Sequence, residues 1–487
     1  MKTSLKPDYA LGIDLGTSGV KAGLLDLASY KLAHVARRAY PGLPEQEPEL
    51  LWEQTVAAIQ DVLGQAGDSR GVQAIGLTGQ MHGAVLFDRH GGIIGPLLSW
   101  KENRWSNPAV IEQIRLTLAD WPRAELGMEL AGGITGAILF GIRESDPQLF
   151  RRIAHVVLPV DFLRSKLLGK GDYATDPTDA GGTGLFDPRL DRWHDGLIRE
   201  LRLPPAILPE VHASAEIAGF LSAGVAHCLG LPEGIPVVFG GGDNQAGMAG
   251  SGLAGPSSPL LVNIGTAAQA SKVMEKFQRF PGLETRAFFD GLFAAVRISL
   301  GGGGSYAWLQ AEHESRTGER VDFAAMDRSA DQVPPGSDGL IFCPGPTRES
   351  PERRRGFLGN AAWVGDLGHQ ARAVLEGVLM DLYEGVEVLD REDAGGMLLA
   401  GGRGLQASPV WAQMAADLFG KRLRLTGSEN AVRGAALLAV KGLGSFDGLE
   451  PSILATKSGR EFVPQTDRTK YYREEFADAW RQAVQAG

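Results

Sequence analysis

Two spacings of hydrophobic residues alternate along this chain. The first is a short apolar run bounded by Gly or Asp, which predicts strands at residues 9–15, 20–26, 73–77 and 83–87. The second repeats every three to four residues and predicts a helix over 49–67, where Leu51, Val56, Ile59 and Leu63 share one side and Gly67 ends the element. Residues 155–169 begin extended and continue as a helix that ends at Gly169.

The second half of the chain repeats this alternation. Apolar runs predict strands at 292–300 and within 395–404, each entering a Gly-rich turn, and helical spacing is found at 368–391, 409–419, 430–442 and 469–487. Alternating strands and helices with Gly-rich turns are typical of an α/β fold whose ligand chemistry lies at the carboxyl ends of the strands.

One strand–turn–strand pattern occurs twice. LGIDLGTSGVKAGLLD at 11–26 and LLVNIGTAAQAS at 260–271 each carry an apolar run into a Gly-Thr turn. A Gly in such a turn lets the backbone approach a ligand closely, and the Thr hydroxyl and successive N–H groups can then cradle a phosphate. Two such turns, one in each half of the chain, predict a duplicated nucleotide clamp.

Two aspartates stand at the ends of apolar strands beside Gly-rich turns. Asp14 precedes the first Gly-Thr turn, and Asp243 follows Gly240, Gly241 and Gly242 in VVFGGGDNQAGMAG at 237–250. This arrangement suits a centre where a metal ion meets phosphate. The alternatives are a turn residue for Asp14 and a helix N-cap for Asp243.

The composition agrees with an enzyme of two domains. The 487 residues exceed one hydrophobic core, and the formal net charge of −10 argues against nucleic acid or an anionic membrane as the main partner. Cys228 and Cys343 are too few for a disulfide framework, and the first residues lack a signal-peptide core, so a cytoplasmic location is expected. Many of the 66 Gly lie at predicted strand ends, which suggests tight turns around a ligand. The histidines and cysteines show no zinc-ligand spacing.

Six segments, in order, resemble the FGGY family of carbohydrate kinases. They are LGIDLGTSGVKAGLLD, GLTGQMHGAVLFD (76–88), YATDPTDAGGTGLFD (173–187), FGGGDNQAGMAGSG (239–252), LLAGGRG with PVWAQMAADLFG (398–420), and ENAVRGAALLA (429–439). The resemblance spans roughly residues 9–442. It implies a duplicated actin- and hexokinase-like fold of two domains, residues 1–250 and 251–487, hinged around ATP. The absence of a Walker A sequence is expected for this fold.

The resemblance also implies roles for individual residues. Asp243 is the expected catalytic base, and Asp14 and Asp243 are the expected positions for Mg²⁺. The residues expected to contact the sugar are Gln80, Met81, His82, Trp100, Arg104, Asp243 and Asn244, with Glu102 as a weaker candidate. The residues expected to contact ATP are Asp14, Gly16, Thr17, Ser18, Lys21, Gly265, Thr266, Gly302, Gly401, Gly402 and Arg403.

The substrate expected from this resemblance is a ketose. Gly79-Gln80-Met81-His82-Gly83 resembles the family members that phosphorylate D-xylulose to D-xylulose 5-phosphate, but the members that act on sedoheptulose carry the same motif. NIGTAAQAS and residues 299–304 also resemble the sedoheptulose enzymes, so another sugar or polyol stays open. His82 could instead be a core histidine, Lys21 a solvated lysine, and Trp100 a buried tryptophan.

Two other functional classes use the same scaffold. A heat-shock-type ATPase would lack a sugar, and a sugar sensor would bind without turnover. The sugar-kinase motifs and the presence of both Asp14 and Asp243 favour a kinase. Its expected partners are a ketose and ATP, with no nucleic acid or membrane, and a homodimer is expected.

Overall fold

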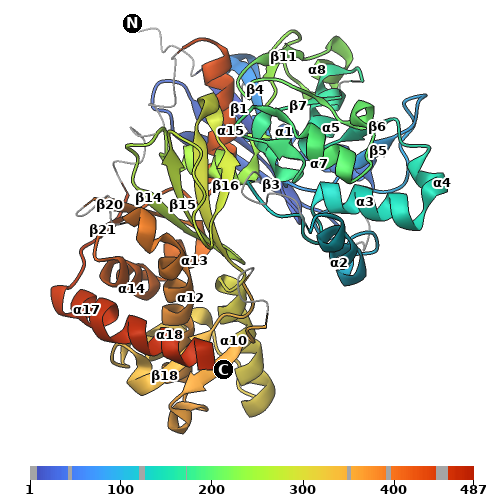
Figure 1. Cartoon of the computed structure of the whole chain (residues 1–487). Helices are drawn as coiled ribbons and strands as arrows, with labels where there is room; N and C mark the ends of the chain where they lie inside the picture. The colour runs from blue at the N-terminus through green and yellow to red at the C-terminus, as the bar shows by residue number, and fades with distance from the viewer. Residues whose placement is uncertain are drawn as a thin grey trace, which may run out of the picture.

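The computed structural model describes residues 8–41, 46–67, 69–101, 103–119, 127–171, 173–347, 352–390, 396–445 and 459–486. Two mixed sheets organise the chain, one in each half (Figure 1). The N-terminal sheet has the order β11-β12-β4-β1-β2-β3, with β13 beside the end of β4. Its strands are β1 Tyr9–Leu15, β2 Gly19–Asp26, β3 Leu32–Ala39, β4 Val72–Gly79, β11 Ile217–Phe220, β12 Pro236–Val238 and β13 Gly241–Gly242.

The C-terminal sheet has the order β16-β17-β15-β14-β20-β21-β22. Its strands are β14 Leu260–Ile264, β15 Ala268–Met274, β16 Glu284–Ala287, β17 Phe293–Ser299, β20 Met397–Gly401, β21 Arg422–Leu425 and β22 Glu461–Phe462. Neighbouring strands follow the same series of directions in both sheets. Read from β3 to β11 in the first sheet and from β17 to β22 in the second, the successive pairs are antiparallel, antiparallel, parallel, parallel and antiparallel. The predicted duplication is thereby confirmed at the level of strand order and direction.

Helices cover both sheets and fill the insertions between strands. In chain order they are α1 Pro48–Ala66, α2 Pro108–Thr117, α3 Thr135–Ser145, α4 Pro147–Phe150, α5 Pro159–Leu168, α6 Pro177–Gly182, α7 Asp195–Glu200, α8 Ala223–Leu229, α9 Asp243–Gly250, α10 Gly303–Thr317, α11 Phe323–Asp331, α12 Leu367–Asp390, α13 Gly402–Ala407, α14 Pro409–Phe419, α15 Asn430–Gly442, α17 Thr466–Tyr471 and α18 Ala477–Ala486. The helices predicted at 49–67, 368–391, 409–419 and 430–442 are confirmed to within a residue.

Short strand pairs complete the structure. They are β5 Val85–Phe87 with β6 His155–Val157, β7 Ala174–Thr175 with β10 Glu210–Val211, β8 Phe186–Asp187 with β9 Arg192–Trp193, and β18 Leu340–Cys343 with β19 Gly356–Gly359. The strand predicted at 83–87 begins only at Val85, because the preceding residues turn away from the end of β4. Among the described residues, no helix has both the length and the apolar character that a bilayer span requires.

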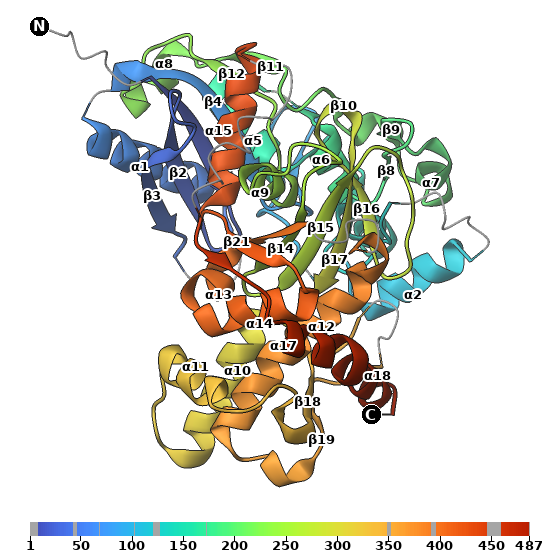
Figure 2. The ribbon, with the colours of Figure 1, turned by 90° about the vertical axis from the view of Figure 1, so that its left-hand side faces the viewer.

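Helix α15 belongs to the C-terminal half of the chain but packs against the N-terminal sheet (Figures 1 and 2). Gly12 pairs with Gly76 on β4 and with Gly23 on β2, so a row of three glycines crosses the centre of this sheet. A Cβ atom at Gly12 would lie 2.1 Å from the Val432 carbonyl oxygen, and one at Gly76 would lie 1.8 Å from that of Ala435. These glycines therefore make room for a helix.

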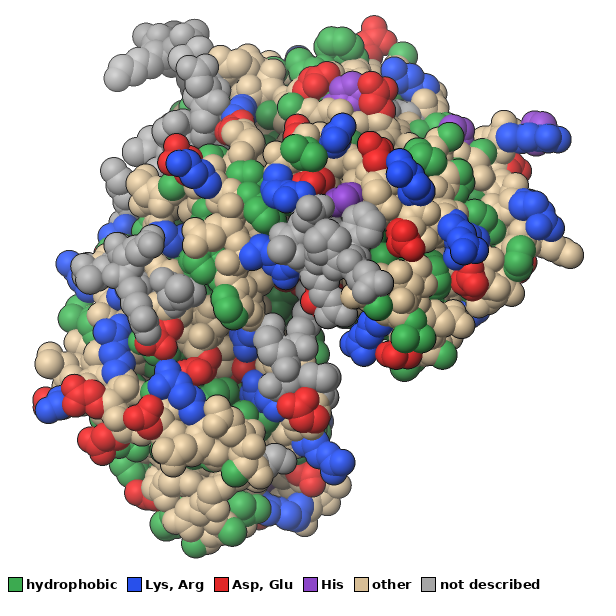
Figure 3. Space-filling view, viewed as in Figure 1, with side chains coloured by type: hydrophobic (Ala, Val, Ile, Leu, Met, Phe, Trp, Pro, Cys, Tyr) green, Lys and Arg blue, Asp and Glu red, His purple; other side chains and the backbone are tan. Residues whose placement is uncertain are grey.

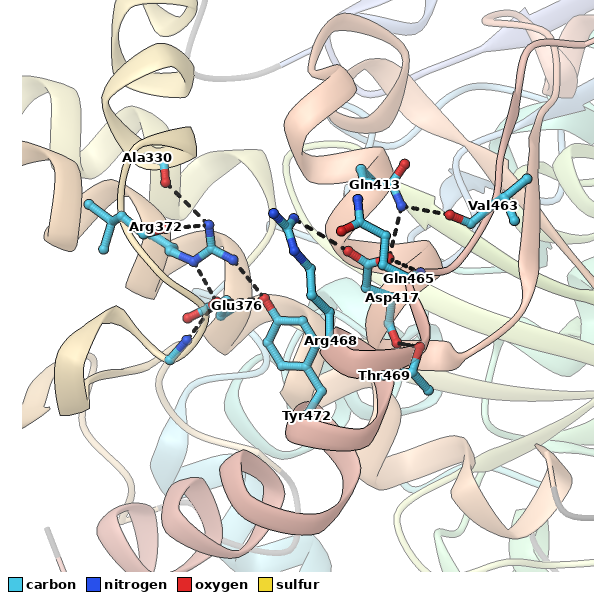
Figure 4. Close-up of polar contacts among 12 residues, drawn as sticks. Ala330, Arg372, Glu376, Gln413, Asp417, Val463, Gln465, Arg468, Thr469 and Tyr472 are labelled. Carbon is cyan, nitrogen blue, oxygen red and sulfur yellow. Dashed lines mark hydrogen bonds and ion pairs between the residues drawn. The ribbon is translucent and has the colours of Figure 1, made fainter.

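The C-terminal segment docks on the C-terminal half through two polar clusters (Figure 4). In one, the Tyr472 hydroxyl donates to Glu376 at 2.7 Å and accepts from Arg372 at 2.9 Å, and all three side chains are buried. In the other, the Thr469 hydroxyl donates to the Asp417 carbonyl at 2.7 Å, and Arg468 pairs with the Asp417 carboxylate. The predicted helix over 469–487 is interrupted by a π-helical turn, Tyr472–Phe476, whose first and last residues are both buried.

Candidate active site

Three parallel strand ends bring the two predicted aspartates together. Asp14 on β1 stands opposite Thr78 on β4, and Thr78 stands opposite Gly241 on β13. Asp243 begins α9 directly after β13. Because β1, β4 and β13 run parallel, their carboxyl ends meet at one edge of the sheet. Gly242 occupies the N-cap position and Asp243 is the first residue of α9, so the alternative of an N-cap is wrong.

The Gly241–Gly242 peptide bond, just before Asp243, is held on both sides by threonines. The Thr78 hydroxyl donates to the Gly241 carbonyl at 2.6 Å, and the Gly242 N–H donates to the Thr178 hydroxyl at 2.9 Å. Thr178 in turn donates to the Asp176 carboxylate at 2.8 Å. All three side chains are buried, so the segment that carries Asp243 has a fixed course.

Asp14 lies in a small network of charges. Lys21 Nζ is 3.1 Å from Asp14 Oδ2 and 3.3 Å from Glu429 Oε2, and Arg37 also pairs with Glu429 at 2.5 Å. Burial raises the pKa of Asp14, with the Lys21 charge acting in the opposite direction. Burial opposes the charged form of Lys21 as well, but Asp14 and Glu429 outweigh it and raise the pKa of that ammonium. Lys21 is therefore an ion-pair partner of Asp14 rather than a solvated lysine.

Asp243 has the properties of a proton acceptor near neutral pH. Burial raises its pKa to about 7, and the negative charge of Asp14 contributes in the same direction, whereas Arg286 and Lys21 act against both. A carboxyl with a pKa close to the working pH can accept a proton from a substrate and still be ionised in a large fraction of molecules. The role of Asp243 as the base stays a prediction, and its raised pKa is compatible with it.

The turn after β4 presents the Gly-Gln-Met-His-Gly motif to a cleft. The Gln80 N–H donates to the Leu15 carbonyl at 2.8 Å, which ties the turn to the end of β1. The Gln80 side chain is buried, lines the cleft, and has no hydrogen-bond partner for either amide atom among the described residues. His82 has a φ of 67°, and its Nδ1 is hydrogen bonded to the Gly182 carbonyl. A left-handed backbone at a non-glycine residue carries strain and is often found at functional sites.

The cleft has a volume of about 840 Å³ and is lined from both halves of the chain. Thr17, Met81, Trp100 and Asn244 reach it from the N-terminal half. The Trp100 indole N–H donates to the Thr17 hydroxyl at 2.8 Å, so the predicted sugar and phosphate residues are in direct contact. Trp100 is 45% exposed, which excludes the alternative of a buried tryptophan. In Figure 3, side chains of both charges are spread over the two halves on the face shown.

The C-terminal wall of the cleft holds residues that the sequence analysis did not identify. Arg286 and Glu284 lie two positions apart on β16, so they share one face of that strand, and both line the cleft. Gln269 on β15 accepts from Asn244 at 2.5 Å and joins the two walls. The sequence signal that could have identified them is the pair of charged residues in Leu-Glu-Thr-Arg-Ala at 283–287, a strand-like segment with alternating residues that is flanked by aromatic residues.

The two predicted phosphate turns are built differently. Gly16, Thr17 and Ser18 join β1 to β2, with Ser18 exposed. In the second turn, the N–H of Gly303 donates to the Gly265 carbonyl at 2.8 Å, and that of Gly304 to the Thr266 carbonyl at 2.9 Å. A Cβ atom at Gly302 would lie 2.5 Å from Ala267. The amino end of α10 is therefore packed against this turn, and two of its N–H groups are already used there.

The predicted ATP residues Gly401 and Gly402 meet the start of α15. Gly401 ends β20 and Gly402 begins α13 with a φ of 82°, where a Cβ atom would lie 2.3 Å from the Ile264 carbonyl oxygen. Asn430 donates to Thr426 at 2.9 Å beside Gly401. Because Glu429 precedes Asn430 and pairs with Lys21, this turn is linked through α15 to Asp14. Arg403 is exposed.

Some predicted residues are not brought to the cleft. Arg104 is exposed, its guanidinium lies 5.4 Å from the centre of the Trp105 ring, and it does not line the cleft. Glu102 falls outside the described residues. Among the described residues, no three His, Cys, Asp or Glu side chains gather into a ready-made metal site.

Comparison with known proteins agrees with this geometry. Residues 9–250 match the model of the N-terminal domain of the FGGY family of carbohydrate kinases, and residues 289–443 match the C-terminal domain. The xylulose kinase of Escherichia coli K12 is 30% identical over 447 residues, which cover 88% of this chain and 89% of that protein. Crystal structures of a gluconate kinase and of a ligand-bound xylulose kinase, both from Lactobacillus acidophilus, superpose with TM-scores of 0.87 and 0.86. Each is 19% identical, and each superposition covers 98% of this chain and 97% of the other.

Proposed function

This chain belongs to the FGGY family of carbohydrate kinases, and from that premise we propose that it transfers the γ-phosphoryl group of ATP to the terminal hydroxyl of D-xylulose. The product is D-xylulose 5-phosphate. The match to a xylulose kinase over most of both chains supports the sugar, together with the Gly-Gln-Met-His-Gly motif at 79–83. The fold alone does not select it, since a gluconate kinase superposes equally well.

The observation that carries the proposal is the position of Asp243. Its carboxyl lines the cleft, has a pKa of about 7, and follows a peptide held by Thr78 and Thr178. We assign Asp243 as the base that accepts the proton of the ketose hydroxyl as that oxygen attacks the γ-phosphorus. Phosphoryl transfer needs alignment and charge stabilisation more than covalent chemistry, and a fixed carboxylate supplies the first of these.

Gln80, Met81, His82, Trp100 and Asn244 form the proposed sugar site. The buried Gln80 amide has both a donor and an acceptor to offer to hydroxyl groups. The His82 ring is held through Nδ1 by the Gly182 carbonyl and lines the cleft, where we place it beside a sugar hydroxyl. A cleft lined from both halves excludes water when it closes on the sugar, so that water does not compete for the γ-phosphate.

The residues at the strand ends fit a divalent cation. Burial raises the pKa of both Asp14 and Asp243, and the negative charge of Asp14 raises the pKa of Asp243 further, so a cation at this edge would favour the ionised form of both. Oxygen ligands from one or two carboxylates, with phosphate oxygens and water, are what Mg²⁺ prefers. When bound with ATP, Mg²⁺ neutralises phosphate charge. We propose Asp14 and Asp243 as its positions, with Lys21 keeping Asp14 ionised.

We propose that ATP spans the two halves of the chain. The Gly16–Ser18 and Gly265–Thr266 turns would hold its phosphates, with Gly302 behind the second turn. Gly401, Gly402 and Arg403 would lie on the adenosine side. The division at residues 250 and 251 is part of this proposal, and a homodimer stays a prediction that analytical ultracentrifugation checks.

A coupled assay of ADP release tests the function. The panel contains D-xylulose, D-ribulose, L-ribulose, sedoheptulose, D-gluconate and glycerol, and phosphorus NMR identifies the product. We expect the highest kcat/KM with D-xylulose and no more than background ADP release without a sugar. ATP turnover that is independent of sugar, or sugar binding without turnover, would overturn the proposal. A higher kcat/KM for another sugar would overturn the choice of D-xylulose alone.

A further inference from the structure

Arg286 is a buried arginine in the C-terminal wall of the cleft. It extends from β16 in the C-terminal half, lines the cleft and is 6% exposed. Its Nη1 lies 3.9 Å from the sulfur of Met81, a residue of the Gly-Gln-Met-His-Gly turn in the N-terminal half. The same sulfur would lie 2.7 Å from a Cβ atom at Gly242, directly before Asp243. Arg286, Met81 and the start of α9 are thus contiguous.

The protein supplies this guanidinium with few acceptors. Nε donates to Glu284 Oε2 at 2.7 Å, and Nη2 lies 2.5 Å from the same oxygen. The remaining contact, from Nη1, is to the thioether, which is a weak acceptor. Arginine has five N–H donors, so two of them have no acceptor among the residues that the structure describes.

A buried donor without an acceptor is costly unless a ligand provides one. Gln80, on the opposite wall of the same cleft, is 1% exposed and also lacks partners among the described residues. Polar groups that lack a partner among the described residues, two N–H donors of Arg286 and the amide of Gln80, therefore lie at one cleft from both halves of the chain. Sugar oxygens are the acceptors that such a cleft would receive.

We propose that Arg286 is a sugar-binding and specificity-determining residue, whose guanidinium donates from the C-terminal half to an oxygen of the bound sugar. This rests on the proposed function. Glu284 is the positioning residue: by taking Nε and Nη2, it leaves Nη1 directed toward Met81 and the cleft. Because a guanidinium only donates, the site selects for a sugar oxygen at this point and against analogues that lack one.

Three variants test the assignment. Arg286→Met removes the donors and keeps the length, Arg286→Lys keeps the charge without the planar fork, and Arg286→Met with Glu284→Gln removes the ion pair as a unit. Sugar affinity is measured by calorimetry without ATP, and KM is measured for both substrates. The sugar used is the panel member with the highest kcat/KM for the wild type.

We expect Arg286→Met to weaken sugar binding and raise the sugar KM by roughly 10- to 150-fold, with the KM for ATP changed by less than about twofold. Arg286→Lys should fall between this variant and the wild type. The double variant should keep the high sugar KM while it regains thermal stability.

The double variant separates a sugar contact from a structural role. If the loss came only from leaving Glu284 unpaired, neutralising Glu284 would return the sugar KM to the wild-type value, and the proposal would be overturned. If neither methionine variant folds, Arg286→Lys decides, because an unchanged sugar KM in it overturns the contact. A wild type that turns over no sugar contradicts the proposed function, whereas an active wild type with insensitive variants contradicts only the assignment of Arg286.

Discussion

Replacing Asp243 by Asn should make the protein more stable while it greatly slows catalysis. Asn has nearly the same shape but cannot accept the proton, and loss of a general base lowers kcat by roughly 10²–10⁴. The gain in stability comes from the surroundings of the carboxyl, because burial and the charge of Asp14 oppose its ionisation.

The size and sign of this gain follow from the pKa. Asp243 titrates at about 7 in the folded protein, against 3.8 for an unperturbed aspartate. Between these values the folded state binds the extra proton, so the free energy of unfolding falls as the pH rises from about 4 to about 7. Above pH 7 the full cost is present, and the difference of about three pKa units corresponds to roughly 4 kcal/mol. Asn lacks this cost at every pH.

Urea unfolding of both proteins at pH 5 and pH 8 measures the effect. Both are studied with EDTA and without nucleotide, because a bound cation would stabilise the carboxylates. We expect the free energy of unfolding of Asp243→Asn to exceed that of the wild type by about 4 kcal/mol at pH 8 and by only about 1.5 kcal/mol at pH 5. The difference grows by about 1.4 kcal/mol for each pH unit between about pH 4 and pH 7, where the folded wild type holds a proton that the unfolded chain has lost. Asp195→Asn, at an exposed aspartate of α7, is the matched control and should show no such trend.

A stability difference that is the same at both pH values would refute the reasoning. So would a destabilised Asn variant at pH 8, since it would mean that the ionised carboxylate makes net favourable contacts with Lys21 and Arg286. Catalysis is judged separately: a variant that keeps more than about a tenth of the wild-type kcat rules out Asp243 as the base.

Four further outcomes are expected. The kcat/KM of the wild type should fall about tenfold per unit below pH 7 as Asp243 takes up its proton, and a profile flat from pH 5.5 to 8 contradicts this. Asp14→Ala should weaken turnover at limiting Mg²⁺ with sugar binding nearly intact, and calorimetry with Mg·ATP checks the assignment. His82→Ala should raise the ketose KM about 5- to 150-fold without lowering the melting temperature, whereas a drop in melting temperature alone would make it a core residue. Tyr472→Phe should lower the free energy of unfolding by about 1–3 kcal/mol because Arg372 and Glu376 lose a buried partner. Tyr471→Phe, at a hydroxyl that makes no hydrogen bond to the part of the chain that the structure describes, is the control for which little change is expected.

Sequence patterns predicted the elements best where burial of apolar side chains alone determines the structure. The apolar runs at 9–15 and 73–77 form β1 and β4, because strands at the centre of a sheet are buried on both faces. The places of Asp14 and Gly79 near the carboxyl ends of these strands follow from the same runs. The meeting of Asp14 with Asp243 was predictable for the same reason, as parallel strands end at one edge.

What the sequence did not reveal depends on contacts between distant segments. Glu429 reaches Lys21 and Arg37 only because α15 crosses to the N-terminal sheet. Arg286 enters the cleft only because β16 lies at the edge of the other sheet. The π-helical turn at 472–476 was equally hidden, since Tyr472 meets Arg372 and Glu376 from a different helix. No local spacing encodes such pairings.

The glycine row beneath α15 has a consequence for the order of folding during synthesis. The first sheet is complete in sequence at residue 242, but the helix that covers its Gly12–Gly76 groove ends at residue 442. At about 5–20 residues per second, a ribosome needs on the order of 10–40 s to make that helix after it has made the sheet. During this interval the groove is not covered, because the N-terminal half has been synthesised and α15 has not. Chaperone dependence should therefore concentrate on this half, although it is the first to emerge.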